Sequence, residues 1–272
     1  MRAAFSPCPN DTFVFHAWVH GLLPGAPRLE VRYADVDVTN RWAERADGDL
    51  LKISYAALPW ALRAGYVLLP SGGALGRGCG PLVLARDAGL DLAGCSVAIP
   101  AERSTAYLLF RLWLAGTPVE VRVLPFAQIM PAVRDGVVAA GLVIHEARFT
   151  YPAYGLSALV DLGQWWEEDT GLPIPLGAIV ARPDRDPAAL GRWVRASVEQ
   201  AWDHPERSAA YVAAHAAELD PAVQAAHIAL YVTEFTRDLG AEGEAAVAAL
   251  LRRAASAGLV PEVAPAAARP AR

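Results

Sequence analysis

The sequence lacks the features that mark a secreted, membrane-spanning or nucleic-acid-binding protein. No segment approaches about 18 uninterrupted apolar residues, so none is expected to span a bilayer. The N-terminus has no charged segment followed by an apolar one of the secretory kind. Lys and Arg form no dense cluster and the net charge is -5, which argues against nucleic acid or anionic lipid as a partner. We therefore expect a cytoplasmic protein that binds a small molecule, with no nucleic-acid or membrane partner.

Cysteine is scarce, and the common catalytic motifs are missing. The 3 cysteines, Cys8, Cys79 and Cys95, are far apart and lack metal-ligand spacing, so we expect neither a disulfide nor a zinc site. Cys8 lies at a predicted turn from strand to helix, where it is either an activated thiol or a packed one. We find no serine-hydrolase elbow, paired-histidine metal motif or kinase motif set.

What is present is an alternation of short apolar runs with longer helical patterns, which predicts parallel sheets with helices on their faces. The expected strands are residues 3–5, 29–33, 51–53, 82–85, 96–99, 119–124, 137–144, 158–162 and 174–181. After about residue 187 the pattern is almost wholly helical, over 190–202, 208–217, 223–231 and 242–255. Residues 261–272 are rich in Ala and Pro and are expected to be a frayed tail. The fold class is therefore α/β with a helical C-terminal part.

A chain of 272 residues exceeds one typical domain of about 100–200 residues, so two lobes are expected. The strands around 80–86 and 174–181 are candidate crossovers between them. We expect a smaller lobe, residues 85–176, inserted into a larger discontinuous lobe made of residues 1–84 and 177–272. A cleft between lobes is a usual place for a ligand.

Polar residues follow three of the predicted strands and precede helical patterns. They are Asn10 and Asp11, then Ser54, and then Ser104 and Thr105. The carboxyl ends of parallel strands face the ligand crevice, and each following helix offers free N–H groups. The alternative interpretation is that these residues are ordinary helix N-caps. Their convergence would make a pocket for a carboxylate or a polyol.

The glycine-rich run at 71–80 lacks the Lys-Ser/Thr end of a phosphate-binding loop. It suits either a hinge or a loop laid against a ligand. Arg77 within it is a possible anion partner.

His145 follows the apolar run at 137–144, where a strand is expected to meet the cleft. A histidine of ordinary pKa can accept a proton near neutral pH, although a lone histidine is more often structural. Glu146 and Arg148 fit a local ion pair. Nearby aromatic residues either line a binding site or fill a core, namely Phe149, Tyr151, Tyr154, Trp165 and Trp166.

Six segments in order along the chain carry a resemblance to a known family. Residues 6–13, 52–56, 71–78, 104–107, 145–151 and 171–177 resemble motifs of the 1,4-dihydroxy-6-naphthoate synthases of the futalosine route to menaquinone. The resemblance implies a two-lobed periplasmic-binding-protein-like fold of type 2, with a cleft between the lobes and no cofactor. It implies a lyase that converts cyclic dehypoxanthinylfutalosine to 1,4-dihydroxy-6-naphthoate and releases a dihydroxyacetone fragment. Glu102-Arg103, ahead of Ser104, departs from the neutral lead-in expected there.

By this resemblance His145 is the proton acceptor, and Ser54, Thr105 and Ala106 bind a small-molecule carboxylate substrate. Further candidates, placed by neighbourhood, are Asn10, Asp11, Thr12, Asn40 and Lys52. Two other functions stay open, a chorismate dehydratase of the same pathway and a binding protein that does no chemistry. The sequence does not indicate the oligomeric state.

Overall fold

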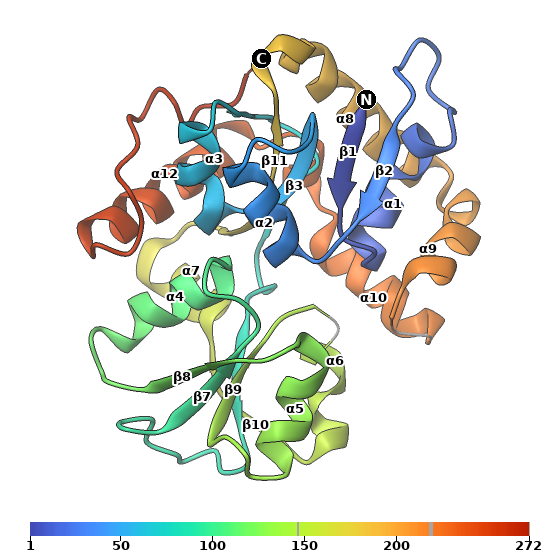
Figure 1. Ribbon diagram of the computed structural model, residues 1–272. Coiled ribbons are helices and arrows are strands. Elements are labelled where there is room, and N and C mark those ends of the chain that lie inside the picture. Colours follow the sequence, from blue (N-terminus) through green and yellow to red (C-terminus); the bar gives the residue numbers. More distant parts are fainter. Residues whose placement is uncertain (146, 218–219, 272) are drawn as a thin grey trace.

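The computed structural model describes residues 1–145, 147–217 and 220–271 of the chain. Its strands form two separate sheets, each covered by helices, and the sheets lie one above the other in Figure 1. We call the six-stranded sheet with its helices the outer lobe, and the five-stranded sheet with its helices the inserted lobe. Both chain termini lie in the outer lobe (Figure 1).

The sheet of the outer lobe has the order β2-β1-β3-β11-β4, and β5 also pairs with β11. β1 runs parallel to β2 and β3, whereas β11 runs antiparallel to β3, β4 and β5. The strands are β1 (Arg2–Phe5), β2 (Glu30–Tyr33), β3 (Leu50–Ser54), β4 (Val67–Leu68), β5 (Ala74–Gly76) and β11 (Ile174–Ala181).

The sheet of the inserted lobe has the order β10-β6-β9-β7-β8. β7 runs parallel to β8 and β9, and β6 runs antiparallel to β9 and β10. The strands are β6 (Leu82–Ala85), β7 (Ser96–Ile99), β8 (Glu120–Val123), β9 (Ala140–Val143) and β10 (Ser157–Asp161). The expectation of purely parallel sheets is therefore wrong. β6 and β11, which carry the chain between the lobes, both run against their neighbours.

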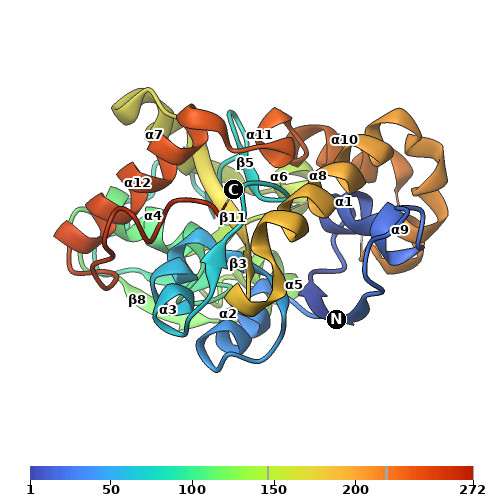
Figure 2. The same cartoon turned by 90° about the horizontal axis from the view of Figure 1, so that it is seen from above.

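Helices cover both sheets, and the C-terminal part of the chain is helical as expected. The outer lobe has α1 (Pro9–Val19), α2 (Val36–Glu44), α3 (Leu58–Arg63), α8 (Pro187–Asp203), α9 (Ala209–His215), α10 (Pro221–Tyr231), α11 (Glu234–Arg237) and α12 (Gly240–Ser256). The inserted lobe has α4 (Thr105–Leu114), α5 (Phe126–Arg134), α6 (Ala147–Thr150) and α7 (Leu162–Thr170). Seen from above in Figure 2, α8 to α12 spread across the outer lobe.

The helix α1 is buried all round because it is apolar on every side. Residues 9–18 are all buried, and α1 packs against α8, α9 and α10. A helix without a polar face belongs in the interior. Its polar first turn, which contains Asn10 and Asp11, is therefore also buried.

One hydrophobic core extends across both lobes. It includes Ile53 of β3 in the outer lobe, Val83 and Val97 of the inserted sheet, and Phe110 of α4. α4 contacts both β9 of its own sheet and β11 of the other. The lobes are thus packed together on the side of α4.

The Ala/Pro-rich segment packs against the outer lobe over its described residues, 261–271, so the expectation of a frayed tail is wrong for them. The backbone N–H of Ala271 donates to the carbonyl of Leu68 at 2.8 Å. Val263 and Ala268 pack against the core. Apolar residues within the Ala/Pro-rich segment thus give it a surface to bury.

The chain passes from the outer to the inserted sheet between β5 and β6, and returns between β10 and β11. These passages lie close to the boundaries expected at 84/85 and 176/177. The division into domains at those residues stays our prediction. No helix in the described ranges is long and apolar enough to cross a membrane.

Candidate active site

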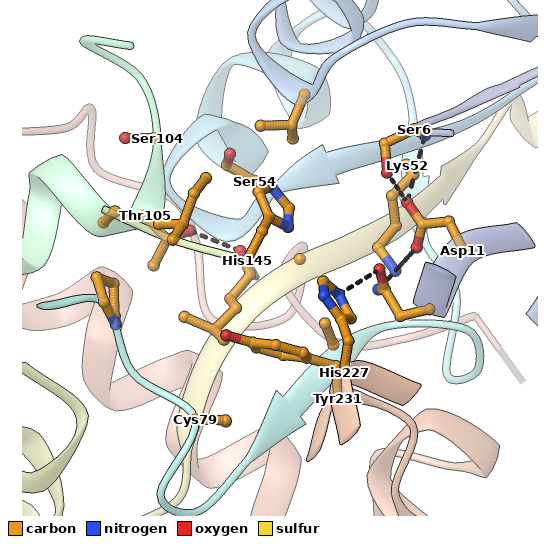
Figure 3. Close-up of a pocket in the computed structure, with 18 of the residues that line it drawn as sticks. Ser6, Asp11, Lys52, Ser54, Cys79, Ser104, Thr105, His145, His227 and Tyr231 are labelled. Carbon is orange, nitrogen blue, oxygen red and sulfur yellow. Dashed lines mark hydrogen bonds and ion pairs between the residues drawn. The ribbon is translucent and has the colours of Figure 1, made fainter. Parts of the chain in front are cut away.

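A pocket lies between the lobes, where the carboxyl ends of parallel strands from both sheets meet. β1 and β3 approach it from the outer lobe, and β7 and β9 from the inserted lobe, as expected for ligand crevices of α/β sheets. The side chains that carry its chemistry are drawn in Figure 3. Polar lining residues are Ser6, Asn10, Asp11, Thr39, Lys52, Ser54, Cys79, Ser104, Thr105, His145, His227 and Tyr231.

A buried ion pair forms one wall of the pocket. The ammonium of Lys52, on β3, lies 2.8 Å from Oδ1 of Asp11 and donates to the carbonyl of Gly72 at 2.9 Å. Oδ2 of Asp11 accepts from the hydroxyl of Ser6 at 2.7 Å. Lys52 is 6% and Asp11 3% exposed, and a buried pair persists only when further hydrogen bonds satisfy it. Lys52 is also the single lysine of the sequence, in a chain that otherwise uses arginine.

Asn40 and Ser54 are joined by two hydrogen bonds at the end of β3. The side-chain amide of Asn40 donates to Oγ of Ser54 at 3.2 Å and accepts from the backbone N–H of Ser54 at 2.8 Å. Asn40 itself does not line the pocket. Because the oxygen of Ser54 already accepts one bond, its hydroxyl proton is suited to donate to a ligand oxygen.

The start of α4 brings Ser104, Thr105 and Ala106 into the pocket. Oγ of Ser104 caps the helix by accepting from the backbone N–H of Tyr107 at 3.1 Å. The hydroxyl of Thr105 donates to the carbonyl of Leu176 at 2.7 Å and accepts from the N–H of Ala56 at 3.2 Å. Both of these partners belong to the outer lobe. The hydroxyl of Thr105 therefore links the lobes. The first N–H groups of a helix have no acceptor within the helix, and at α4 they belong to residues that line the pocket.

His145 lies just beyond β9, where the backbone turns sharply. Its φ is +54°, a conformation that a residue other than glycine seldom adopts and that often marks a functional position. Its ring contacts Phe126 edge-on, with centroids 5.7 Å apart. On α6, Arg148 pairs with Asp161 and donates to the carbonyl of Gly80 at 2.8 Å, which anchors the chain after His145.

The sequence analysis missed two aromatic-ring side chains of the site, both on α10. His227 is 1% exposed, and its ring stacks on that of His145 with centroids 5.9 Å apart and an interplanar angle of 11°. Tyr231 lies one turn further along α10, and the centroid of its ring is 4.7 Å from that of His227. In Figure 3 these rings close the side of the pocket opposite Ser54.

Burial sets the charge state of two lining groups. It lowers the pKa of His227 to about 3, with the nearby His145 as a second cause. It raises the pKa of the Cys79 thiol to about 12. At neutral pH the first is a neutral imidazole and the second a thiol.

Several other expectations need correction. The aromatic residues around 149–166 do not line this pocket, and Trp166 is fully buried in the core, where its indole donates to the carbonyl of Pro173 at 3.1 Å. Arg77 is no anion site in the pocket, because it pairs with Glu242 at 2.7 Å and Glu167 at 3.8 Å. The expected pair of Glu146 and Arg148 falls partly outside the described residues, since Glu146 is not among them.

The glycine-rich run both turns the chain and contacts the pocket. It contains β5, and its Ala74 and Cys79 are lining residues. Gly72 has a φ of +85°, and its carbonyl accepts from Lys52. A second hollow on the side of α5 shares His145 and Ser104 with the pocket and gives it an entrance. Among the described residues, no group of His, Cys, Asp and Glu is arranged to hold a metal ion.

Comparison with known proteins gives concordant results. A family model described as menaquinone biosynthesis matches residues 1–256. A 1,4-dihydroxy-6-naphthoate synthase of Streptomyces coelicolor is 61% identical, with 97% of this chain and 96% of that protein covered. The enzyme of the same name from Thermus thermophilus is 52% identical, with 95% of each chain covered.

Solved structures agree on the fold. A protein from Archaeoglobus fulgidus superposes with a TM-score of 0.89 at 32% identity, over 95% of this chain and 98% of that one. The periplasmic aliphatic sulphonate binding protein of Escherichia coli superposes with a TM-score of 0.67 at 16% identity, over 96% of this chain and 88% of that one. The likeness to this binding protein confirms the expected periplasmic-binding-protein-like fold, and the motif resemblance is confirmed as well. The chain belongs to the menaquinone biosynthesis family.

Proposed function

We propose that this protein is a cytoplasmic lyase that converts cyclic dehypoxanthinylfutalosine to 1,4-dihydroxy-6-naphthoate and releases a dihydroxyacetone fragment. The names of the relatives at 61% and 52% identity support the product. The observation that carries the proposal is the position of His145, a histidine with a left-handed backbone that lines the pocket between the lobes together with Ser54 and Thr105.

The reaction needs a base near a carbonyl of the substrate. Removal of the proton forms an enolate, whose collapse expels the fragment, and aromatisation of the ring supplies driving force. A neutral histidine suits this task because the ordinary pKa of imidazole is about 6.5. In this proposal His145 is that base.

The surrounding groups suit the other parts of the substrate. The hydroxyl of Ser54 and the first N–H groups of α4, at Thr105 and Ala106, are donors for a carboxylate or for a developing oxyanion. Lys52 makes this wall positive only in part, because Asp11 neutralises it. Its role is to fix the wall of the pocket.

The proposal is tested by incubating the purified protein with the cyclic substrate and following naphthoate by chromatography. The parent protein should form product, and the His145→Asn variant should keep its fold and substrate binding while turnover falls by about 10²- to 10⁴-fold. A binding protein without chemistry would bind the compound and release it unchanged. If His145→Asn converts the substrate within a few-fold of the parent rate, the base is another residue.

A further inference from the structure

His227 is an unusual residue for its position in the fold. It lies on α10, deep in the outer lobe, and is 1% exposed. A buried imidazole is costly unless its polar atoms are satisfied. Its presence in the lining of the pocket therefore requires a reason beyond filling space.

A chain of buried polar contacts fixes the state of this ring. Nε2 of His227 lies 3.2 Å from Oδ1 of Asn10, and the amide nitrogen of Asn10 donates to Oδ1 of Asp11 at 3.1 Å. The same Asp11 oxygen accepts from Lys52 at 2.8 Å. Since the acidic Asp11 side chain can only accept here, the amide of Asn10 must turn its oxygen to His227. The proton of His227 is therefore on Nε2, and Nδ1 is its basic nitrogen.

His227 also contacts the inserted lobe, through the ring of His145. The ring of His145, from the inserted lobe, stacks on His227, from the outer lobe, with planes 11° apart. Phe126 contacts His145 edge-on from α5. The ring proposed to accept the proton is thus held between Phe126 of its own lobe and His227 of the other. Figure 3 shows the rings of His145 and His227.

We propose that His227 is a positioning residue for the reaction, a neutral imidazole protonated at Nε2 that holds the ring of His145 across the gap between the lobes. The inference rests on the proposed function, in which His145 is the base. In this arrangement Lys52, Asp11 and Asn10 affect catalysis by fixing the orientation of the His227 ring. The contacts run from Lys52 to Asp11, then to Asn10 and His227, and finally to the ring of His145.

The groups around His145 and His227 favour a state in which only one of the two imidazoles is positively charged. The titratable groups facing it are the Asp11 and Lys52 pair, the Cys79 thiol and the Tyr231 phenol. Burial and the nearby His145 lower the pKa of His227 to about 3, so His227 stays neutral when His145 takes up a proton. Cys79 is uncharged, because burial raises its pKa to about 12.

The first experiment needs no substrate. Long-range ¹H–¹⁵N spectra of protein labelled in its histidines report the tautomer and charge of each ring, and His227 is assigned from the spectrum of His227→Gln. We expect a protonated Nε2 and an unprotonated Nδ1, unchanged from pH 7.5 to pH 5. A mixture of tautomers in Asn10→Leu would support the role of Asn10. A protonated Nδ1, or a doubly protonated ring at pH 7, would overturn the inference.

The second experiment measures kinetics in His227→Phe, which keeps a ring but loses both nitrogens. We expect kcat to fall by about 10- to 100-fold with KM changed by less than about threefold, the size of effect that follows from misplacing a reacting group. The acid limb of kcat/KM should move to lower pH, because protonated His145 loses a polar neighbour. The matched control is His215→Phe on α9, outside the pocket, which should retain parent activity.

A double-mutant cycle separates positioning from substrate contact. If Asn10 acts through His227, Asn10→Leu should lower kcat in the parent but have no further effect in His227→Phe. Should His227→Phe unfold, His227→Leu, which likewise cannot donate to Asn10, gives the same comparison. If folded His227 variants have the kcat of the parent and an unshifted acid limb of kcat/KM, the inference about His227 is refuted. The proposed function is not affected by that result. A parent protein that forms no naphthoate would refute the proposed function instead.

Discussion

Ser54 and Thr105 both begin helical segments that face the pocket, but their hydroxyl groups have different partners. The oxygen of Ser54 accepts from Asn40, so its proton is suited to a substrate. The proton of Thr105 is donated to the carbonyl of Leu176 in the other lobe. The same kind of residue, at the same kind of place, thus serves binding in one case and the contact between lobes in the other.

This difference predicts opposite phenotypes for two small substitutions. Ser54→Ala should raise KM with a smaller loss of stability, because it leaves only one N–H of Asn40 without its acceptor. Thr105→Val keeps the shape but leaves the Leu176 carbonyl and the Ala56 N–H unsatisfied, so it should lower the free energy of unfolding by about 1–3 kcal/mol. Denaturant unfolding and steady-state kinetics of both variants are the measurement. A stable Thr105→Val with weak substrate binding would instead make Thr105 a substrate ligand.

Buried histidines make the stability of the fold depend on pH. Burial lowers the pKa of His227 to about 3, and burial together with His20 and Arg207 lowers that of His16. A group whose folded-state pKa is lowered binds fewer protons in the folded state, so its contribution is complete above the unfolded value of about 6.5. It is lost as the pH falls from there towards about 3.

We therefore expect the free energy of unfolding to decrease steadily from pH 7 to pH 4.5. Urea titrations at half-unit intervals measure it. In His227→Gln, which has no imidazole to protonate at this position, the decrease should be smaller. An equal slope in the parent and the variant would mean that other groups cause the acid sensitivity.

The candidate site could be predicted where its residues lie close to the carboxyl end of a strand, and not where they lie in a helix far from any strand. Ser54 ends β3, Thr105 begins the helix that follows β7, and His145 lies just beyond β9, and all three line the pocket. His227 lies within a helical pattern, and which face of a helix meets a pocket depends on packing between distant segments. Only the spacing of His227 and Tyr231, one turn apart on α10, was available as a signal.

At the scale of elements, β9 and α5 set the position of His145. Gly141 in β9 lies against α5, and a Cβ atom there would come within 2.6 Å of Cγ2 of Ile129 and 2.8 Å of Cγ2 of Val133. Both of these residues are fully buried, so neither can turn out of the way. The strand and the helix can approach this closely only because residue 141 has no side chain.

Gly141→Ala should therefore push α5 from β9 and move His145 with the strand. We expect a loss of about 1–3 kcal/mol in stability, as for other overpacked sites, together with a lower kcat. Gly89→Ala is the control, because a Cβ at Gly89 would meet Asp87 at an ordinary contact distance of 3.6 Å. Parent-like kcat in a destabilised Gly141→Ala would show that the strand does not transmit the shift.

The longer elements were predictable because their apolar patterns are strong, whereas direction and short pairings were not. β7 and β9 are buried runs with a clear signal. β4 and β5, with bounds Val67–Leu68 and Ala74–Gly76, are too short to show a period. The direction of β11 depends on where the chain returns from the other lobe, which no local pattern encodes.

For the molecule as a whole, the two sides of the cleft are built differently. On the side of α4 the lobes share a core and are joined by Thr105 and by the ion pair of Arg103 with Glu44. On the side of α5 a hollow separates them and leads to His145. Any closing motion should therefore pivot near α4 and narrow the hollow.

Hydrogen exchange followed by mass spectrometry tests this motion. The N–H of Ala56 donates to Thr105 across the lobes, so the peptide that contains it should be protected with and without the naphthoate product. Peptides from α5 and α10, which border the hollow and the pocket through Phe126 and His227, should gain protection only when the product is bound. In Thr105→Val the Ala56 peptide should exchange faster in the free protein, because the joint near α4 has lost a bond. If the free parent protein already exchanges rapidly at Ala56, and small-angle scattering shows a larger radius of gyration without product, the lobes separate on both sides and α4 is not the pivot.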